Sequence, residues 1–305
     1  MLRAAFISLS ESRSIRTAAE KTWIGQRLSR RFVAGTTVDD AMAATRAMNQ
    51  LGLGVSVDNL GENVTNADEA RHSAQLYHQM LDRMAEQGGD ANVSLKLTHM
   101  GLDVNEAMAY EITAGLVQHA ARLKSFVRVD MEGSPYTQRT LDFVHRLHRQ
   151  PENAGRVGAV IQAYLYRSEK DIEQLIADRI RVRLCKGAYK EPPEIAFKEK
   201  ADVDANYVKL MKMLLKSGVY HGIATHDENM ILATLEFAQK EKIPASAFEF
   251  QMLYGIRRDL QVKLVKEGWR CRIYIPFGTE WYPYLMRRLA ERPANAIFIL
   301  KNLFR

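Results

Sequence analysis

The chain has 305 residues, of which 47% are hydrophobic and 26% are charged, a balance that argues against disorder and fibrous repeats. The net charge of +7 is spread along the chain and indicates no particular anionic partner. No run approaches the roughly 18 apolar residues of a membrane span, and two cysteines are too few for a disulfide framework. We therefore expect a cytoplasmic protein, with peripheral contact to a membrane left open.

The first 50 residues predict helices that precede the main domain. Residues 17–33 form one candidate helix and residues 37–50 another. In the second, Thr37 is placed to cap the amino end, and Asp39 and Asp40 complement the helix dipole. We expect a helical extension over residues 1–50, packed below or beside a main domain over residues 51–305.

From residue 51 onward, short apolar or β-branched segments alternate with amphipathic ones. The predicted strands are residues 53–57, 92–98, 126–131, 157–163, 180–185, 222–225, 248–253 and 272–275. The predicted helices between them include residues 68–87, 105–123, 138–149, 169–177, 203–216, 228–240 and 257–266. Eight strands in unbroken alternation with helices favour an α/β fold of the (β/α)8 barrel type. A doubly wound open sheet is the competing arrangement.

Five predicted strands alternate polar with apolar residues. Because successive side chains on a strand point to opposite faces, the apolar set is expected to face the helices and the polar set the barrel lumen. The charged members of the polar set include Lys96, Asp130, Arg183 and Glu249. Buried charges are costly unless they are paired. The pattern therefore predicts an ion-pair network or a bound polar ligand inside the barrel.

The active sites of such barrels lie at the carboxyl ends of the strands. Polar residues collect there in this sequence, namely Lys96, Asp130, Gln162, Arg183, Lys186, Thr225, His226, Gln251 and Tyr274. The last predicted helix adds a polar face, which consists of Tyr284, Arg287, Arg288 and Glu291 at i, i+3, i+4 and i+7. Adjacent arginines can grip a carboxylate bidentately. These patterns by themselves predict a barrel that binds a small anion.

The segments that carry these residues resemble the proline dehydrogenase family, the flavin-dependent proline oxidases. The matching segments follow in family order and are residues 94–97, 129–132, 182–189, 224–227, 248–255, 274–278 and 284–291. The resemblance implies a distorted (β/α)8 barrel that oxidises L-proline to Δ1-pyrroline-5-carboxylate with FAD as the hydride acceptor. The sequence has no complete dinucleotide-binding fingerprint after a strand, so the flavin would be held by barrel loops.

The resemblance also implies roles for individual residues. Asp130 and Arg183 would be catalytic, with Arg183 near the flavin and Asp130 orienting cationic groups or accepting the amine proton. The proline contacts would be Lys96, Tyr189, Leu253, Tyr274, Tyr284, Arg287 and Arg288. The FAD contacts would be Met131, Gln162, Arg183, Lys186, Gly187, Ala188, Tyr189, Thr225, His226 and Gln251. No metal is expected.

Two alternative functions stay open on the sequence. Lys96 and Lys186 at strand ends are compatible with a Schiff-base lyase or aldolase, although no Gly-rich phosphate site follows the last strands. A non-enzymatic basic barrel for nucleic acid or a membrane surface would need clustered cations. Here the cations are mixed with carboxylates, so we expect no nucleic acid partner.

The resemblance further implies partners and one departure. A membrane quinone is the expected electron acceptor. A separate pyrroline-5-carboxylate dehydrogenase is the expected next enzyme, since no aldehyde dehydrogenase segment follows the barrel. Tyr274 favours proline over hydroxyproline. Lys190 and Glu191 replace a Trp-Asp pair that some family members carry after the same motif, which leaves the surroundings of the flavin open.

Overall fold

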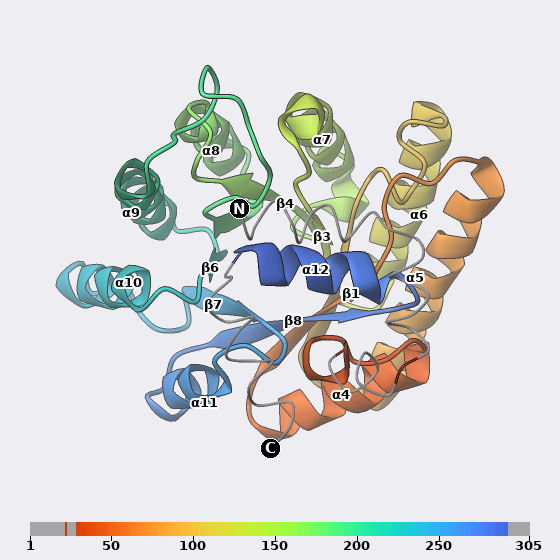
Figure 1. The fold of residues 1–305 in the computed structure, drawn as a ribbon, viewed down its shortest axis with the longest axis horizontal. Coiled ribbons are helices and arrows are strands. Elements are labelled where there is room, and N and C mark those ends of the chain that lie inside the picture. Colours follow the sequence, from red (N-terminus) through yellow and green to blue (C-terminus); the bar gives the residue numbers. More distant parts are fainter. Residues whose placement is uncertain (1–21, 23–28, 292–305) are drawn as a thin grey trace.

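A closed barrel of parallel strands is the centre of the fold in a computed structural model, which describes residues 22 and 29–291. Each strand pairs with the next one in the sequence, and β8 pairs with β1. The strands are β1 (Gly54–Asn59), β2 (Ala91–Leu95), β3 (Val127–Val129), β4 (Val157–Gln162), β5 (Arg181–Cys185), β6 (His221–Ala224), β7 (Phe248–Leu253) and β8 (Cys271–Phe277). The predicted (β/α)8 barrel is confirmed, and the open-sheet alternative is wrong (Figure 1).

Helices between the strands form an outer wall around the barrel (Figure 1). They are α5 (Ala67–Gln87), α6 (Glu106–Arg122), α7 (Ser134–His148), α8 (Ser168–Ala177), α9 (Lys200–Lys216), α10 (Glu228–Lys240) and α11 (Arg258–Lys266), with a short 3-10 turn, η1 (Pro151–Asn153), before β4. The structure begins α7 at Ser134 rather than at residue 138, because Pro135 in the first turn is compatible with a helix start.

The helix before the barrel, α4 (Val38–Gln50), completes the outer wall. Asp40 N–H donates to the Thr37 hydroxyl and Thr37 N–H donates to the Asp40 carboxylate, which makes a reciprocal capping box. α4 packs against β1, β8 and α5, between α11 and α5 in the ring of helices (Figure 1). The predicted helix at residues 37–50 therefore lies beside the barrel, and the predicted helix at residues 17–33 lies mostly outside the described residues.

The last described helix, α12 (Trp281–Glu291), is not part of the outer wall. It crosses the middle of the barrel in the view of Figure 1. Its Leu285 belongs to a small apolar cluster with Phe32 and Leu60, against which Ile256 packs. Leu60 follows β1 and Ile256 follows β7, so α12 covers the carboxyl ends of the strands. The barrel mouth therefore has a roof.

The two faces of the strands carry different side chains. Apolar residues that alternate along the strands, such as Leu95, Val129, Leu184 and Phe250, are completely buried between barrel and helices. Polar side chains at the intervening positions fill the lumen and bond to one another. The predicted inward-facing polar set is therefore confirmed.

Two strand ends differ from the prediction in a way that matters for the site. β2 ends at Leu95 rather than at residue 98, because the N–H groups of His99 and Met100 donate to Lys96 O and turn the chain. β1 instead continues to Asn59, beyond the predicted end at residue 57. Asp58 thus lies on the last part of β1 and Lys96 is the first residue after β2, both at the barrel mouth.

Candidate active site

Arg183 on β5 lies at the centre of the lumen and is buried. All three nitrogens of its guanidinium donate hydrogen bonds: Nε to Gln251 Oε1, Nη1 to Asp130 Oδ1 at 2.7 Å, and Nη2 to the hydroxyls of Ser94 at 3.0 Å and Ser56 at 3.3 Å. The partners come from β1, β2, β7 and the residue after β3. Arg183 thus ties together strands from opposite sides of the barrel.

Asp58, Lys96, Asp130 and Tyr274 lie at the barrel mouth, and we call them the mouth cluster. The Tyr274 hydroxyl donates to Asp130 Oδ2 at 2.9 Å, and Lys96 Nζ donates to Asp58 Oδ2 at 3.3 Å. The guanidinium carbon of Arg183 lies 5.3 Å from the centre of the Tyr274 ring. The structure therefore joins the two residues predicted to be catalytic with Tyr274, a predicted proline contact, and places Lys96 beside Asp58 in the same cluster.

Burial and neighbouring charges act on the titratable groups of the mouth cluster. Burial raises the pKa of Asp58, and the Lys96 ammonium opposes this rise. Burial alone would lower the pKa of Lys96, but the carboxylates of Asp58 and Asp130 outweigh it and raise that pKa. Burial and the same two carboxylates raise the pKa of Tyr274. At neutral pH the mouth therefore offers an ammonium group and a phenol that donates hydrogen bonds.

A second group of predicted residues lies at the ends of β5 and β6. Lys186 Nζ donates to Asp204 Oδ1 at 2.5 Å and to Asp227 Oδ2 at 2.7 Å. His226 Nε2 accepts from the N–H of Leu253 at 2.9 Å, which leaves the other ring nitrogen of a neutral His226 as the donor. The polar tips of these side chains are thus held by neighbouring strands and helices.

The adjoining ends of β3 and β4 carry Met131 and Gln162, which are both buried. The Gln162 amide donates to the main-chain oxygen of Glu132 at 2.9 Å. The Glu132 carboxylate in turn accepts the Thr98 hydroxyl at 2.6 Å. The predicted FAD contacts on β3, β4, β5 and β6 therefore form one continuous edge of the barrel, with buried Thr225 completing it on the β6 side.

The loop after β5 is attached at both ends. Gly187 has a φ of +114°, and a Cβ on it would lie 2.4 Å from the ring of Tyr164, so the main chain lies against that ring. Further on, a carboxylate oxygen of Glu191 accepts the N–H of Ser134 at 2.8 Å, at the amino end of α7. Residues 188–190 between these attachments, which include Ala188 and Tyr189, are exposed.

The structure describes the side chains of only some of the site residues predicted on α12. Tyr284 is buried in the apolar cluster under α12. Arg287 and Arg288 belong to the helix, but their side chains and that of Glu291 lie outside the described residues. Their role in binding a carboxylate stays a prediction.

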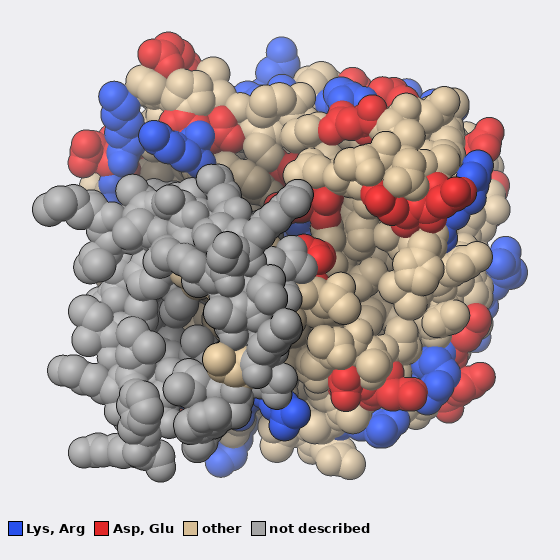
Figure 2. Space-filling view, turned by 45° about the vertical axis from the view of Figure 1, so that its right-hand side comes forward, with Lys and Arg blue, Asp and Glu red and all other residues tan. Residues whose placement is uncertain are grey.

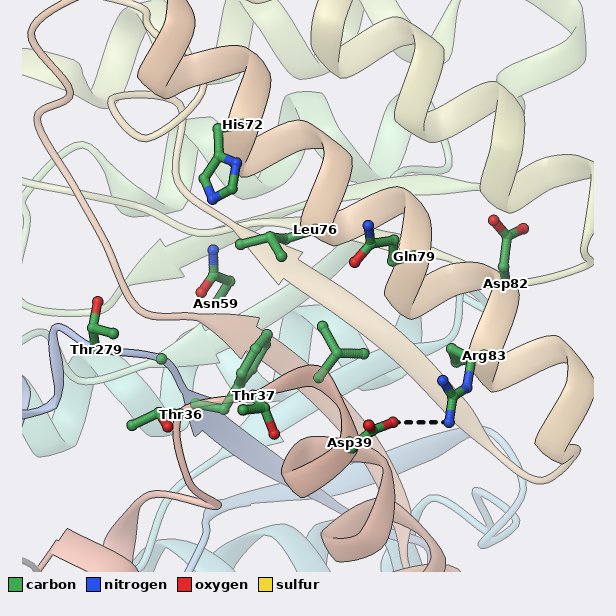
Figure 3. A pocket seen from close by; sticks show the side chains of 13 residues that line it. Thr36, Thr37, Asp39, Asn59, His72, Leu76, Gln79, Asp82, Arg83 and Thr279 are labelled. Atoms are coloured by element: carbon green, nitrogen blue, oxygen red, sulfur yellow. Dashed lines mark ion pairs between the residues drawn. The ribbon is translucent and has the colours of Figure 1, made fainter.

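A separate hollow of about 620 Å³ lies on the outer wall between α4 and α5 (Figure 3). Arg83 on α5 and Asp39 on α4 pair across it at 2.9 Å. Its lining includes Asn59, His72 and Thr279 but none of the predicted site residues. The hollow therefore reaches the carboxyl ends of β1 and β8 from outside but contains no residue of the mouth cluster.

Comparison with known proteins agrees with this geometry. A profile of the family described as proline dehydrogenase matches residues 41–301. Proline dehydrogenase 2 of Bacillus subtilis (strain 168) is 41% identical over 301 residues, which covers 99% of this chain and 98% of that protein. The proline dehydrogenase of Deinococcus radiodurans is 37% identical over 309 residues and covers 100% and 98%, respectively.

The chain belongs to the proline dehydrogenase family.

Solved structures of the family are similar as well. The crystal structure of PutA from Bdellovibrio bacteriovorus inactivated by N-propargylglycine has a TM-score of 0.83 and 27% sequence identity. The match covers 90% of this chain but 34% of PutA. The family fold of this chain thus corresponds to one part of a much longer protein, whereas the two dehydrogenases above match it from end to end.

Membership of the proline dehydrogenase family leaves both alternative functions without support. A lysine that forms a Schiff base needs a lowered pKa, whereas the pKa of Lys96 is raised and Lys186 is paired with two carboxylates. Among the described residues on the face shown in Figure 2, lysine and arginine are interspersed with aspartate and glutamate and form no single basic patch.

Sequence reasoning missed part of the site. Asp58 is absent from the predicted site, because the first predicted strand ends at residue 57. Ser56 and Asp58 nevertheless alternate with valines, which is a signal for a longer strand. Deeper in the lumen, near the amino ends of the strands, lie Arg128, Glu249 and Arg272, which we call the floor cluster. Strand parity predicts that all three residues face the lumen, which is confirmed, but it assigns them no role at the site.

Proposed function

We propose that this protein oxidises L-proline to Δ1-pyrroline-5-carboxylate with FAD as the hydride acceptor, the first step of proline breakdown to glutamate. The observation that carries the proposal is the mouth cluster beneath α12. An amino acid brings a carboxylate and an amine, and the mouth cluster presents the Lys96 ammonium and the Asp130 carboxylate on neighbouring strands. The family to which the chain belongs supports the same reaction.

The residues at the mouth fit a flavin cofactor. A continuous edge of buried and half-buried polar groups runs along the ends of β3 to β6, and the exposed residues 188–190 follow the end of β5. When bound, FAD supplies the hydride acceptor that amino acid side chains lack. The residues that would hold it are Met131, Gln162, Arg183, Lys186, Gly187, Ala188, Tyr189, Thr225, His226 and Gln251.

The chain's own residues bind and orient the substrate in this proposal. Lys96 binds the proline carboxylate together with Arg287 and Arg288. Asp58 is the one hydrogen-bond partner of Lys96 Nζ among the described residues, so the ammonium keeps N–H donors for that carboxylate. The residues that enclose the ring are Tyr189, Leu253, Tyr274 and Tyr284. Holding the ring in one orientation in a covered mouth lowers the barrier for transfer.

Asp130 and Arg183 are the groups that act closest to the chemistry. Asp130 accepts hydrogen bonds from Arg183 and Tyr274 and so fixes both side chains. Its carboxylate is also a suitable acceptor for the amine proton, since hydride loss requires a neutral amine. The Arg183 cation stabilises the negative charge that a hydride acceptor gains. α12 covers the mouth and limits the entry of water.

The proposal extends to a membrane quinone as the electron acceptor and to a separate pyrroline-5-carboxylate dehydrogenase that takes the product. It places the protein in the cytoplasm, in contact with a membrane face where quinone is available. Among the described residues, no helix has both the length and the apolar character to cross a membrane. The bifunctional protein PutA of Escherichia coli, of which this chain matches 24%, supports a second activity downstream.

Anaerobic titration of the purified protein with L-proline tests the proposal. The protein is expected to be yellow, and L-proline is expected to bleach its visible absorption with release of Δ1-pyrroline-5-carboxylate. D-proline is the matched control and is expected to leave the spectrum unchanged. Purified protein that binds no flavin overturns the cofactor, and bound flavin that L-proline does not bleach overturns the substrate.

A further inference from the structure

A chain of hydrogen bonds runs along the lumen from the floor cluster to Arg183. Arg272 Nε donates to Glu249 Oε1 at 2.8 Å, and the Gln251 amide donates to the same oxygen at 2.6 Å. The other end of that amide, Gln251 Oε1, accepts from Arg183 Nε. Glu249 and Gln251 stand two residues apart on β7 and therefore face the same side of the sheet.

These hydrogen bonds fix the orientation of the Gln251 amide. Its nitrogen faces a carboxylate and its oxygen faces a guanidinium N–H, so a flipped amide would set acceptor against acceptor and donor against donor. Burial would raise the pKa of Glu249, but Arg272 and the hydrogen bonds to the carboxylate hold that pKa below its ordinary value. Glu249 is thus an anion, and it orients Gln251 through a charge-assisted hydrogen bond.

A glycine on the intervening strand makes room for this chain. Gly222 on β6 lies between Arg183 and Glu249 in the strand register. A Cβ at Gly222 would lie 2.3 Å from the amide nitrogen of Gln251. The absent side chain therefore lets Gln251 lean across β6 and reach Arg183.

We infer that Glu249 and Gln251 are positioning residues that hold the guanidinium of Arg183 in place for the reaction. The inference rests on the proposed function, in which Arg183 lies beside the flavin. Arg272 fixes the floor end of this hydrogen-bond chain, because it also donates to Val55 O at 2.8 Å and to Asp90 at 2.8 Å. Arg183 is thus connected to the opposite end of the barrel through buried polar groups.

Gly222→Ala is the sharpest variant, because one added methyl group displaces the end of a flexible side chain rather than backbone. With FAD supplied at saturation, we expect the variant to keep a proline KM within about twofold of the parent and to lose at least about tenfold in the rate of flavin reduction by proline. The flavin midpoint potential is expected to become more negative, since a loosely held cation favours reduced flavin less. Gly115→Ala on α6, where an added Cβ meets nothing within 4 Å, is the matched control.

A second variant interrupts the hydrogen-bond chain at the floor cluster. Glu249→Leu/Arg272→Leu removes both members of the ion pair at once, so neither is left buried without the other and the barrel is expected to fold. It is expected to show the same split, with slower reduction at a nearly unchanged KM. If both variants reduce flavin at the parental rate and potential, the inference is overturned.

A readout that does not depend on the reaction separates this inference from the proposed function. In arginine-labelled protein, the Nε–H signal of Arg183, assigned by its loss in Arg183→Lys, is expected to exchange with solvent at least about tenfold faster in Gly222→Ala than in the parent. Unchanged exchange overturns the positioning role whatever the protein oxidises. Faster exchange in a protein that proline does not reduce supports the positioning role and overturns the proposed function alone.

Discussion

The floor cluster and the mouth cluster are both sets of ionisable residues in one lumen, yet they differ in how fully they are bonded. On the floor, Glu249 and Arg272 pair at 2.8 Å with side chains only 6% and 8% exposed. Arg272 uses every nitrogen of its guanidinium, on Glu249, Val55 O and Asp90. At the mouth, Lys96 is 13% exposed and its one hydrogen bond among the described residues, to Asp58, is 3.3 Å long.

This difference separates two uses of buried charge. An ion pair such as Arg272 and Glu249, in which every guanidinium nitrogen and both carboxylate oxygens are bonded, can orient its neighbours but has little left for a ligand. At the enclosed mouth, an ammonium with unused N–H donors gains a hydrogen-bond acceptor when a substrate carboxylate binds. The floor is therefore expected to act on stability and orientation, and the mouth on binding.

The largest effect is expected from breaking the floor pair on one side only. Arg272→Leu leaves the Glu249 carboxylate buried without its cation, and breaking a buried pair in this way costs about 3–5 kcal/mol. We expect the free energy of unfolding, measured by urea denaturation at neutral pH, to fall by that amount.

The double variant Glu249→Leu/Arg272→Leu is the control for this prediction, because it also removes the carboxylate that the single variant leaves without its cation. It is expected to recover most of the lost stability. A single variant as stable as the double variant would show that the floor pair is no more than a surface-like ion pair.

A buried neutral histidine at the amino end of β6, on the side that faces the helices, makes stability depend on pH. His221 Nδ1 accepts the N–H of Val182, and burial together with Arg128 and Arg181 lowers the pKa of His221 to about 3. In the unfolded chain His221 binds a proton near pH 6.5, whereas in the folded protein it stays neutral down to about pH 3. Its contribution to the free energy of unfolding is therefore complete above about pH 6.5 and is lost as the pH falls toward 3. Each such histidine contributes up to about 1.4 kcal/mol per pH unit to the slope.

His221→Asn tests this dependence, because the amide oxygen can replace Nδ1 as an acceptor without titrating. Unfolding free energies between about pH 7 and pH 5 are expected to fall less steeply in the variant. His99, near the mouth, has its pKa lowered to about 4 mainly by burial and is expected to supply much of the slope that remains. Equal slopes in parent and His221→Asn would contradict the prediction.

The lumen could be predicted from the sequence because side-chain parity is a local property of a strand. In β7 the predicted bounds of 248–253 are confirmed, with Phe248 and Phe250 outward and Glu249 and Gln251 inward. Eight strands in alternation with helices, five of them with this parity, then leave a closed barrel as the compact solution. Fold and polar lumen follow from patterns that each segment carries by itself.

The partners inside the lumen could not be predicted, because they depend on register around the whole barrel. The contact between Arg183 and Gln251 requires that the strand between them carries glycine at position 222. Lys186 is similarly held by Asp204 and Asp227, which lie in other segments of the chain. Pairings of this kind are set by the closed sheet and are invisible in any single segment.

At the mouth, Lys96→Met is expected to weaken binding more than stability. In the proposed site the Lys96 ammonium donates one charge-assisted hydrogen bond to the proline carboxylate, so without it KM is expected to rise about 10- to 100-fold with a smaller change in kcat. Steady-state rates with an artificial electron acceptor measure both. Lys186→Met is the matched control at another strand end, and it is expected to weaken FAD binding while the proline KM changes little.

The smallest effect is expected from an ion pair on the outer wall with the same chemistry as the floor pair. Lys209 and Glu169 pair at 2.6 Å, closer than Glu249 and Arg272, but their side chains are 55% and 42% exposed. Water and salt screen such a pair, so Lys209→Ala is expected to change the free energy of unfolding by less than about 1 kcal/mol. A loss as large as that of Arg272→Leu would mean that burial is not what distinguishes the floor, since geometry alone favours the outer pair.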